Sequence, residues 1–339
     1  MPAAKKRKIT IAKAMAEAIA HEMRADPRIV VMGEDIAQLG GVFGNTRGLL
    51  DEFGPERVRD TPISETAFIG AAVGMAAAGM KPVVELMFVD FFGVCMDAIY
   101  NLAAKQSYFS GGNVACPMVL MTSVGGGYGD AGQHSQTLFA TFGHLPGLKV
   151  VIPSNAYDAK GMMIAAIRDP NPVVFMFHKA LQGMGWLGTV QSSVVDVPEE
   201  AFEIELGTAA VVRPGDDITI AGLGHTVHLA IEAAKELAKV GVEAEVIDLR
   251  SVAPLDRATI LGSVGKTRAF LSVDDDYMSY GVGAELVATV AETAVLKARP
   301  QRISYPDIPV PFAPEMEHAV LPSAGKIVAA VQRILGGNE

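Results

Sequence analysis

Cysteine is scarce in this sequence, with two residues, Cys95 and Cys116, among 339. Two thiols cannot form the disulfide framework of a small secreted protein or a zinc-binding thiolate cluster. No export signal is recognisable, because Lys13, Glu17 and His21 interrupt the segment that would have to be its apolar core. We therefore expect the protein in a reducing compartment, the cytoplasm.

Charged residues are also few, at 19% of the chain. The 28 basic against 38 acidic residues give a net charge of −10, which argues against nucleic acid as the main partner. The low charge fraction also argues against a disordered chain. Half of the residues are hydrophobic, which predicts large buried sheet faces, subunit interfaces, or both. The uncharged stretch 67–80 is shorter than the roughly 20 residues that span a bilayer, so we expect no membrane segment.

Short apolar strands alternate with helical patterns along the chain, which is typical of parallel sheets covered on both faces. In the first half we expect strands at 29–32, 82–88, 117–124, 148–152 and 172–177, and helices at 9–25, 66–80, 91–108, from about 135, and at 156–168. In the second half we expect strands at 217–221, 243–247 and 269–273, and helices at 226–240, 283–296 and 323–335. Thr10 is placed as the cap of the first helix.

A glycine-containing segment with the single tryptophan, Trp186, separates the two halves. We interpret residues 182–200 as a linker between a domain at 1–181 and a domain at 201–339. The expected fold class is therefore α/β, with two successive domains built on mainly parallel sheets.

A Gly-Leu-Gly-His-Thr-Val sequence at 222–227 follows a predicted strand and opens a predicted helix, and the next strand is followed by Asp248. A nucleotide-binding fold places its phosphate turn and ribose ligand in this way. The third glycine of that motif is missing, because Val227 stands in its place. The ordinary alternative is a tight strand-to-helix turn, for which glycine is a common residue.

Two other segments also have two interpretations. The glycine-rich residues 125–130 precede His134, which we expect beyond a strand of a parallel sheet, where α/β folds bind ligands. His134 is thus either a functional or a structural histidine. The three aspartates at 274–276 suggest a divalent cation site, but consecutive aspartates do not share one face, and we favour a solvated loop.

Residues 60–65, Asp-Thr-Pro-Ile-Ser-Glu, are more informative. Pro62 fixes an extended approach, Ser64 can cap the following helix, and Glu65 lies in its first turn. That helix is almost entirely small and apolar. A single carboxylate at the mouth of a dry region is expected to bind a specific donor or to be partly protonated, so we favour a functional role for Glu65 over helix-dipole stabilisation.

Six blocks of the sequence together resemble a known family. They are Gly-Glu-Asp at 33–35, the block at 60–65, AAKQSYFSGG at 103–112, QHSQ at 133–136, HLPGLKVVIPS at 144–154 and VIDLRSVAPLD at 246–256. In this order they resemble the beta subunits of the thiamine-diphosphate-dependent 2-oxoacid dehydrogenases and acetoin dehydrogenases, from about residue 9 to 322. The resemblance implies a pyrimidine-binding domain followed by a transketolase C-terminal-type domain.

The resemblance also implies roles for particular residues. Glu65 corresponds to the carboxylate that bonds N1′ of the coenzyme's aminopyrimidine, and a buried glutamate suits proton sharing because its pKa can rise. Glu34, Met87 and Phe91 correspond to further residues around the pyrimidine. His134 corresponds to a histidine near the coenzyme that acts during transfer to lipoyl.

Two metal ions follow from the same resemblance. A structural K⁺ maps onto the backbone carbonyls of Met118, Ala166 and Ile167, with Asp169 and Asn171. Mg²⁺ and diphosphate binding needs Gly-Asp-Gly followed by asparagines, and residues 215–217, Gly-Asp-Asp, do not begin that arrangement. We therefore expect an alpha subunit to hold the Mg²⁺ and to share the thiamine diphosphate, in an α2β2 assembly.

The expected reaction is decarboxylation of a 2-oxoacid (pyruvate or branched-chain) or cleavage of acetoin, with acyl transfer to lipoyl on a dihydrolipoyl acyltransferase core. Residues 91–94, Phe-Phe-Gly-Val, and the glycine-rich loop depart from the pyruvate-dehydrogenase pattern, so the oxo substrate is left open. The alternatives are an NAD-dependent dehydrogenase built on Gly222–Asp248 and a non-catalytic interaction subunit. Retention of Glu65 and His134 weighs against the second.

Overall fold

The computed structural model describes residues 7–185 and 188–336. Its contacts divide the chain into two compact units. The first unit comprises the described residues up to Val124 together with Thr141–Leu206, and the second comprises Gly125–Ala140 and the described residues from Gly207 onward. The segment that carries His134 therefore packs with the second unit, although its sequence neighbours on both sides belong to the first.

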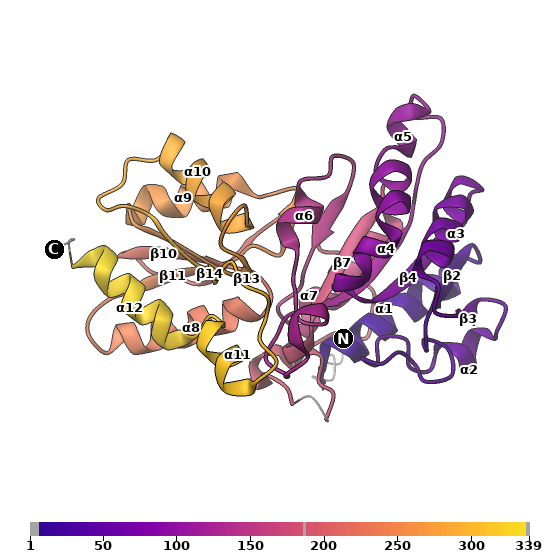
Figure 1. Cartoon of the computed structure of the whole chain (residues 1–339), viewed down its shortest axis with the longest axis horizontal. Helices are drawn as coiled ribbons and strands as arrows, with labels where there is room; N and C mark the ends of the chain where they lie inside the picture. The colour runs from indigo at the N-terminus through magenta and orange to yellow at the C-terminus, as the bar shows by residue number, and fades with distance from the viewer. Residues whose placement is uncertain (1–6, 186–187, 337–339) are drawn as a thin grey trace, which may run out of the picture. The chain divides into compact units, whose positions relative to one another are not determined.

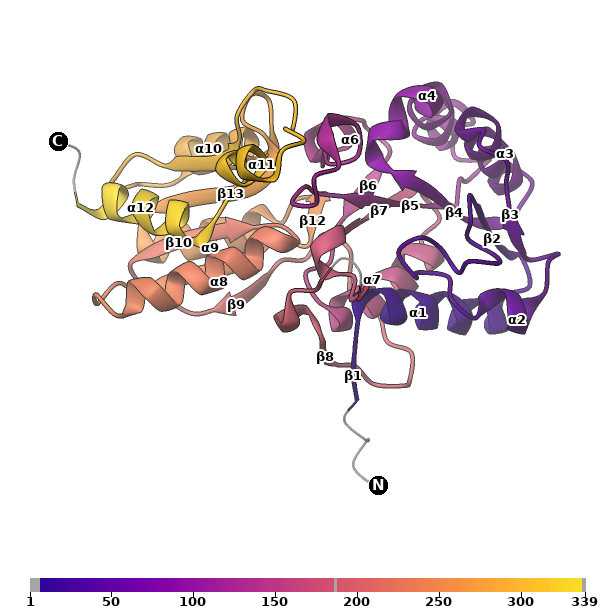
Figure 2. The ribbon, with the colours of Figure 1, turned by 60° about the horizontal axis from the view of Figure 1, so that its bottom comes forward.

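The first unit is built on a parallel sheet with strand order β6-β7-β5-β4-β2-β3. The bounds of these strands are β2 Ile29–Gly33, β3 Val58–Asp60, β4 Lys81–Phe88, β5 Val119–Val124, β6 Lys149–Val151 and β7 Val173–His178. Helices α1 (Ile11–Ala25) and α7 (Ala156–Arg168) pack against each other on one face, and α3 (Glu65–Ala77) and α4 (Phe92–Asp97) lie on the other (Figure 2). Central strands β2, β5 and β7 are buried along their whole length, as a sheet covered on both faces requires.

The second unit contains a five-stranded sheet in the order β14-β13-β10-β11-β9, parallel except for the edge strand β9. Its strands are β9 Ala210–Arg213, β10 Ile218–Gly222, β11 Ala244–Asp248, β13 Phe270–Tyr277 and β14 Gln301–Tyr305. Helices α8 (His225–Ala238) and α12 (Ala324–Leu335) pack together on one face, and α9 (Arg257–Thr267) and α10 (Val282–Thr293) on the other (Figure 1).

Shorter elements complete the chain. They are β1 Lys8–Ile9, α2 Leu49–Phe53, the 3₁₀ turn η1 Val89–Phe91, the π-helical turn η2 Ala98–Ala103, α5 Gln106–Phe109, the 3₁₀ turn η3 Ala131–Gln133, α6 Phe139–Gly143, η4 Lys179–Leu181, η5 Gln191–Ser193, β8 Val195–Asp196, β12 Ser251–Ala253 and α11 Pro314–Val320. Within residues 182–200, the proposed linker, β8 pairs with β1; Trp186 lies outside the described residues. No helix in the described parts of the chain combines the length and the apolar character that a membrane span needs.

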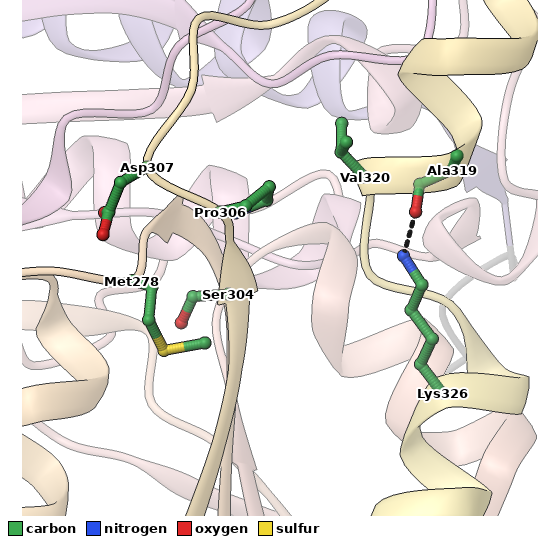
Figure 3. Close-up of a pocket in the computed structure, with 7 residues that line it drawn as sticks. All are labelled: Met278, Ser304, Pro306, Asp307, Ala319, Val320 and Lys326. Atoms are coloured by element: carbon green, nitrogen blue, oxygen red, sulfur yellow. Dashed lines mark hydrogen bonds between the residues drawn. The ribbon is translucent and has the colours of Figure 1, made fainter.

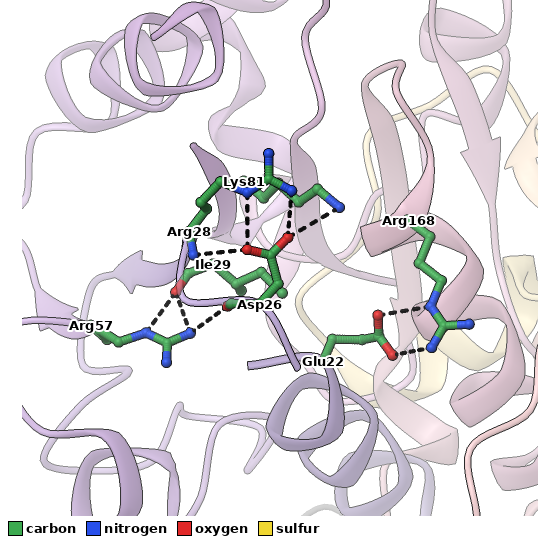
Figure 4. Close-up of polar contacts among 7 residues, drawn as sticks. All are labelled: Glu22, Asp26, Arg28, Ile29, Arg57, Lys81 and Arg168. Carbon is green, nitrogen blue, oxygen red and sulfur yellow. Dashed lines mark hydrogen bonds and ion pairs between the residues drawn. The ribbon is translucent and has the colours of Figure 1, made fainter. Parts of the chain in front are cut away.

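Caps and ion pairs fix the ends of several elements. Thr10 caps α1 as predicted, because its hydroxyl accepts the backbone N–H of Lys13 at 3.3 Å. Arg168, at the end of α7, holds the buried Glu22 carboxylate of α1 with two hydrogen bonds of 2.8 and 2.7 Å (Figure 4). The guanidinium of Arg57 donates to the carbonyl oxygen of Ile29, at the first residue of β2.

Two predicted helices differ in the structure. The helix predicted over 91–108 is divided into η1, α4, η2 and α5, and α4 itself is kinked at Cys95, which departs from helical geometry (φ −117°, ψ 15°). The helix predicted from about Ser135 begins only at Phe139. Leu138 has a left-handed φ of 51°, which a right-handed helix cannot contain.

Candidate active site at the carboxyl ends of parallel strands

Four of the residues predicted to bind the coenzyme lie along one edge of the first unit's sheet. Glu34 directly follows β2, Glu65 follows β3 by five residues, and Met87 lies at the end of β4. Phe91 lies in the 3₁₀ turn after β4. Since β3, β2 and β4 are parallel neighbours, their carboxyl ends meet at the same edge, which is where open α/β sheets bind ligands.

Glu34 is a buried carboxyl group with spare hydrogen-bonding capacity. Its side chain accepts the backbone N–H of Ser64, whereas its Oε1 atom has no hydrogen-bond partner among the described residues. Burial raises the pKa of Glu34, and the negative charges of Glu65 and then Asp35 raise it further. A buried oxygen without a protein partner is suited to a ligand that supplies a donor.

Glu65 is the first residue of α3, and its carboxylate acts electrostatically on Glu34. Ser64 occupies the N-cap position as predicted, but its hydroxyl does not cap the helix: it donates to the carbonyl oxygen of Pro62 at 3.1 Å. Burial, followed by the charge of Glu65, also raises the pKa of the Cys95 thiol to about 12. The carboxyl groups of Glu34 and Glu65 therefore lie in one region of the sheet edge, and Glu65 is half-buried there.

The residues before Glu65 position Glu34. The carboxylate of Asp60 accepts the backbone N–H groups of Ala37 and Gln38 at 2.7 and 3.4 Å. The N–H of Thr61 donates to the carbonyl oxygen of Gly33 at 2.9 Å. The segment 60–65 thus supplies Glu65 and also fixes the chain on both sides of Glu34. Asp60 was not among the predicted site residues, although it opens the most specific motif of the sequence.

Aromatic side chains form an apolar group beside these carboxylates. Phe91 packs edge-on against Phe88, with ring centroids 5.5 Å apart, and Phe88 contacts Phe43 in the same way at 5.7 Å. Phe43 in turn contacts Phe177 of β7. The Met87 carbonyl accepts the hydroxyl of Ser123 at 2.6 Å, which fixes the end of β4 against β5. An aromatic ligand ring would be packed by such a group.

Glu85 is a further buried carboxyl group that the sequence reasoning missed. It lies in β4 opposite Gly33 of β2 and is 1% exposed. The side-chain amide of Asn45 donates to it at 3.5 Å, and its Oε1 has no partner among the described residues. Burial raises the pKa of Glu85 to about 7, because the buried site favours the neutral carboxylic acid over the carboxylate.

His134 lies in the second unit, directly after the turn η3, and is half-buried. Its segment is closed by a hydrogen bond of 3.1 Å from the N–H of Gly125 to the carbonyl oxygen of Gln136. The side-chain amide of Gln136 is also engaged, because its Oε1 accepts the hydroxyl of Tyr277 at 3.2 Å. Glu34, Glu65, Met87 and Phe91 belong to the first unit.

The predicted K⁺ residues gather around the turn between α7 and β7. Asp169 Oδ1 accepts the backbone N–H and side-chain amide of Asn171 at 2.9 and 3.0 Å, and its Oδ2 forms an ion pair with Lys149. The Met118 carbonyl accepts Val173 N–H at 2.9 Å. Ala166 and Ile167 lie in the last turn of α7. An ammonium group thus already neutralises the carboxylate, and any cation here would depend on the carbonyl oxygens.

The prediction of a solvated loop for Asp274–Asp276 is wrong. All three aspartates are buried in β13, which is longer than predicted. Asp274 accepts the backbone N–H groups of Asp276 and Gly283 at 3.1 and 3.2 Å, and Asp276 accepts that of Ala140 at 3.0 Å. Burial, with the charge of Asp276 next, raises the pKa of Asp274 to about 8, so this carboxyl is mainly neutral at neutral pH.

The Gly222–Asp248 segment forms a closed structural turn. The hydroxyl of Thr226 accepts Leu223 N–H at 3.0 Å and lies close to Gly222, where a Cβ atom would be 3.2 Å from it. Asp248 is 0% exposed and accepts Arg250 N–H at 3.0 Å. A ribose could not reach this carboxylate, so the geometry fits the tight-turn interpretation.

The second unit also contains a pocket of about 440 Å³ (Figure 3). It is lined by Met278, Ser304, Pro306, Asp307, Ala319, Val320 and Lys326. The Lys326 ammonium donates to the carbonyl oxygens of Ala319 and Leu321 at 2.6 Å each, and burial lowers its pKa. This ammonium therefore holds the end of α11 against α12. Across the described ranges 7–185 and 188–336, no three His, Cys, Asp or Glu side chains are grouped so as to hold a metal ion.

Comparisons with known proteins agree with this fold. Residues 7–183 match the transketolase pyrimidine-binding domain, and residues 207–327 match the transketolase C-terminal domain. A split-gene transketolase described as an inactive beta4 tetramer shares the fold, with a TM-score of 0.75 and 23% identity, over 98% of this chain and 100% of that one.

Curated relatives extend over nearly the full length. The acetoin:2,6-dichlorophenolindophenol oxidoreductase beta subunit of Cupriavidus necator is 45% identical, over 98% of this chain and 99% of its own. Its counterpart in Bacillus subtilis is 40% identical, over 97% and 98%. The mitochondrial pyruvate dehydrogenase E1 component subunit beta-2 of Oryza sativa is 41% identical, over 96% and 86%. The chain therefore belongs to the family of beta subunits of the thiamine-diphosphate-dependent 2-oxoacid and acetoin dehydrogenases.

Proposed function

We propose that this chain is the beta subunit of a thiamine-diphosphate enzyme that decarboxylates a 2-oxoacid or cleaves acetoin and passes the acyl group to lipoyl. The observation that carries this proposal is the pair of carboxyl groups, Glu34 and Glu65, at the carboxyl edge of three parallel strands. Full-length relatives named for acetoin and pyruvate oxidation support the same class of substrate.

The residues present fit an aminopyrimidine. Glu34 has a buried oxygen without a partner among the described residues, and the negative charge of Glu65 raises the pKa of Glu34. The rings of Phe88 and Phe91 supply apolar packing. When bound, thiamine diphosphate supplies a carbon nucleophile and an electron sink for the bond next to the carbonyl. In this proposal Glu65 holds a proton at the pyrimidine N1′. The pKa of Glu34 beside it is raised, first by burial and then by the charge of Glu65.

His134 is proposed to act on the acyl group as it moves to lipoyl. An imidazole can donate or accept a proton near neutral pH, which suits the thiolate and oxyanion that such a transfer generates. The lipoyl group is carried in this proposal by a dihydrolipoyl acyltransferase core.

An alpha subunit is proposed to complete the site in an α2β2 assembly and to hold Mg²⁺ and the diphosphate. Asp217 Oδ2 accepts the N–H of Glu243 at 2.7 Å, and the Asp216 carboxylate, which is 83% exposed, forms a surface ion pair of 3.5 Å with the Lys266 ammonium. Large apolar side chains on the surface, such as Ile63 and Tyr108 at 85% exposure each, support association with a partner. The two buried, unpaired thiols suit the cytoplasm.

Replacing Glu65 by glutamine tests the proposal directly. Glutamine keeps the size but cannot hold the proton, so the Glu65→Gln variant assembled with its alpha partner should lose about 100-fold or more of kcat. Turnover with pyruvate, with branched-chain 2-oxoacids and with acetoin is measured on the assembled complex, which also ranks the substrates.

A matched control is Glu56→Gln, which changes a glutamate whose side chain is 92% exposed in the same unit. It should leave turnover unchanged. Near-wild-type turnover in an assembled Glu65→Gln complex would overturn the proposed role of Glu65 and, with it, the proposed site.

A further inference from the structure

Glu317 is a fully buried carboxylate in the short helix α11 of the second unit. Its two oxygens accept the backbone N–H groups of Gly127 and Gly129, at 2.7 and 2.9 Å respectively. A buried carboxylate satisfied by two main-chain donors forms strong, charge-assisted hydrogen bonds. These bonds fix the first part of the segment 125–140, which carries His134.

The far end of the same segment is held from β13. Asp276 Oδ2 accepts the N–H of Ala140 at 3.0 Å, and the hydroxyl of Thr137 donates to the carbonyl oxygen of Asp275 at 2.7 Å. His134 lies between these two sets of anchors. Its position is therefore set by the second unit, from which no residue other than His134 itself was predicted for the site.

The conformation of the segment depends on such anchors. Ala131 and Leu138 have left-handed φ values of 58° and 51°, which residues with a side chain adopt only where the surroundings enforce them. Gly126 is packed so closely that a Cβ atom would lie 2.5 Å from the Tyr305 hydroxyl and 3.1 Å from Glu317 Oε1. The backbone at Gly126 therefore packs against Tyr305 and Glu317 with no room for a side chain.

The helix that carries Glu317 is itself fixed. The Lys326 ammonium of α12 donates to the carbonyl oxygens of Ala319 and Leu321, at the end of α11. Hydrogen bonds therefore link α12 to α11, and α11 to Gly127 and Gly129, which lie in the same segment as His134.

We propose that Glu317 is a positioning residue for His134: it holds the segment 125–133 so that the imidazole is presented in one orientation during acyl transfer. The positional part rests on the hydrogen bonds of Gly127 and Gly129 alone, whereas the effect on acyl transfer rests on the proposed function of His134. The two parts are tested separately.

The positional part is tested by amide hydrogen exchange on the assembled complex. In the wild type, the amides of Gly127 and Gly129 should exchange slowly, and in Glu317→Gln the peptide containing them should exchange at least about tenfold faster, because glutamine has one acceptor oxygen in place of two. Glu315→Gln, on the exposed side of the same helix, should leave exchange unchanged. Unprotected amides in the wild type would overturn the proposal even if no variant folds.

The effect on acyl transfer is tested by two assays of Glu317→Gln. Turnover that depends on lipoyl should fall by about 10-fold to 100-fold, as expected when a reacting group is misplaced, while turnover with an artificial electron acceptor should stay within about twofold. Adding Glu317→Gln to His134→Ala should cause no further loss of lipoyl-dependent turnover, because the His134→Ala variant has no imidazole for Glu317 to orient.

The outcomes separate the two proposals. Additive losses in the double variant, or equal losses in both assays, would overturn the positioning role while leaving the function of the enzyme in place. Full activity of Glu65→Gln would instead overturn the proposed function, and the exchange result at Gly127 and Gly129 would still stand or fall on its own.

Discussion

Glu85 is the residue whose protonation should be visible in the stability of the whole chain. Burial raises its pKa from 4.5 to about 7, so the folded protein keeps a proton that the unfolded chain releases above pH 4.5. The folded state then binds more protons than the unfolded state, and the free energy of unfolding falls as the pH rises through this interval. Above the pKa of Glu85 in the folded protein, this contribution to the free energy of unfolding is fully lost.

Replacing Glu85 by glutamine should therefore flatten the dependence of stability on pH. Across the interval the wild type should lose roughly 3 kcal/mol through this group, at about 1.4 kcal/mol per pH unit. Glu85→Gln keeps the amide contact with Asn45 without a titrating proton. Urea denaturation between pH 5 and pH 8 measures the difference in slope, about one proton.

The slope should not vanish in the variant, because Asp274, whose pKa is raised to about 8, contributes in the same direction. Equal slopes for the wild type and Glu85→Gln would show that Glu85 is ionised in the folded protein.

Residues at the site differ in how well the sequence predicts them. Glu65 and Glu34 follow from a carboxylate at the start of an apolar helix and from recognisable motifs. Glu85 and Glu317 could not be found in this way, because the roles of both come from contacts with segments distant in sequence: Asn45 lies 40 residues from Glu85, and Gly127 lies 190 residues from Glu317. Local pattern carries no information on such pairs.

At the scale of elements, α7 contains a glycine that packing requires. A Cβ atom at Gly161 would lie 2.7 Å from side-chain carbons of both Phe202 and Ile204, and the Gly161 carbonyl accepts the N–H of Ile204 at 3.2 Å. The segment that contains Phe202 and Ile204 therefore packs directly against α7 at Gly161. Gly262, in the middle of α9, has no atom within 4 Å of the corresponding position.

Alanine at these two positions should change stability in opposite directions. Gly161→Ala should lower the free energy of unfolding by about 1–2 kcal/mol, because overpacking outweighs the gain in helix propensity. Gly262→Ala should raise it by about 0.5–1 kcal/mol, because only the entropy of the unfolded chain changes. Urea denaturation of both variants checks the signs; stabilisation by Gly161→Ala would show that residues 202–204 move away freely.

The sequence predicts well those helices and strands whose apolar residues keep one regular spacing along the whole element. Helix α7 has the predicted bounds, and the buried strands lie within one or two residues of prediction except for β13. Strand β13 continues through Asp274–Asp276, where backbone N–H groups donate to the carboxylates of Asp274 and Asp276, which charge alone does not reveal. The helix predicted over 91–108 is wrong as a single element: it is divided into four, with a kink at Cys95, although its apolar pattern continues through these residues.

At the scale of the whole molecule, the carboxylates proposed to bind the pyrimidine, Glu34 and Glu65, belong to this chain, and its described residues include no group of three His, Cys, Asp or Glu side chains that could hold a metal ion. Thiamine diphosphate carries a charged tail whose affinity depends on a divalent cation. A beta subunit with this division of groups should recognise one end of the coenzyme and depend on its alpha partner for the other.

Coenzyme affinity measured with and without the partner tests that division. By isothermal titration calorimetry in the presence of Mg²⁺, the isolated chain should bind thiamine diphosphate at least about 100-fold more weakly than the assembled complex, a difference of about 3 kcal/mol. Asp216→Asn and Asp217→Asn, made in the complex, should leave Kd unchanged, because the Asp216 and Asp217 side chains serve Lys266 and the Glu243 amide respectively. If the isolated chain bound the coenzyme as tightly as the complex, or if either variant weakened binding, the cation would be held by this chain and the proposed role of the alpha subunit would be wrong.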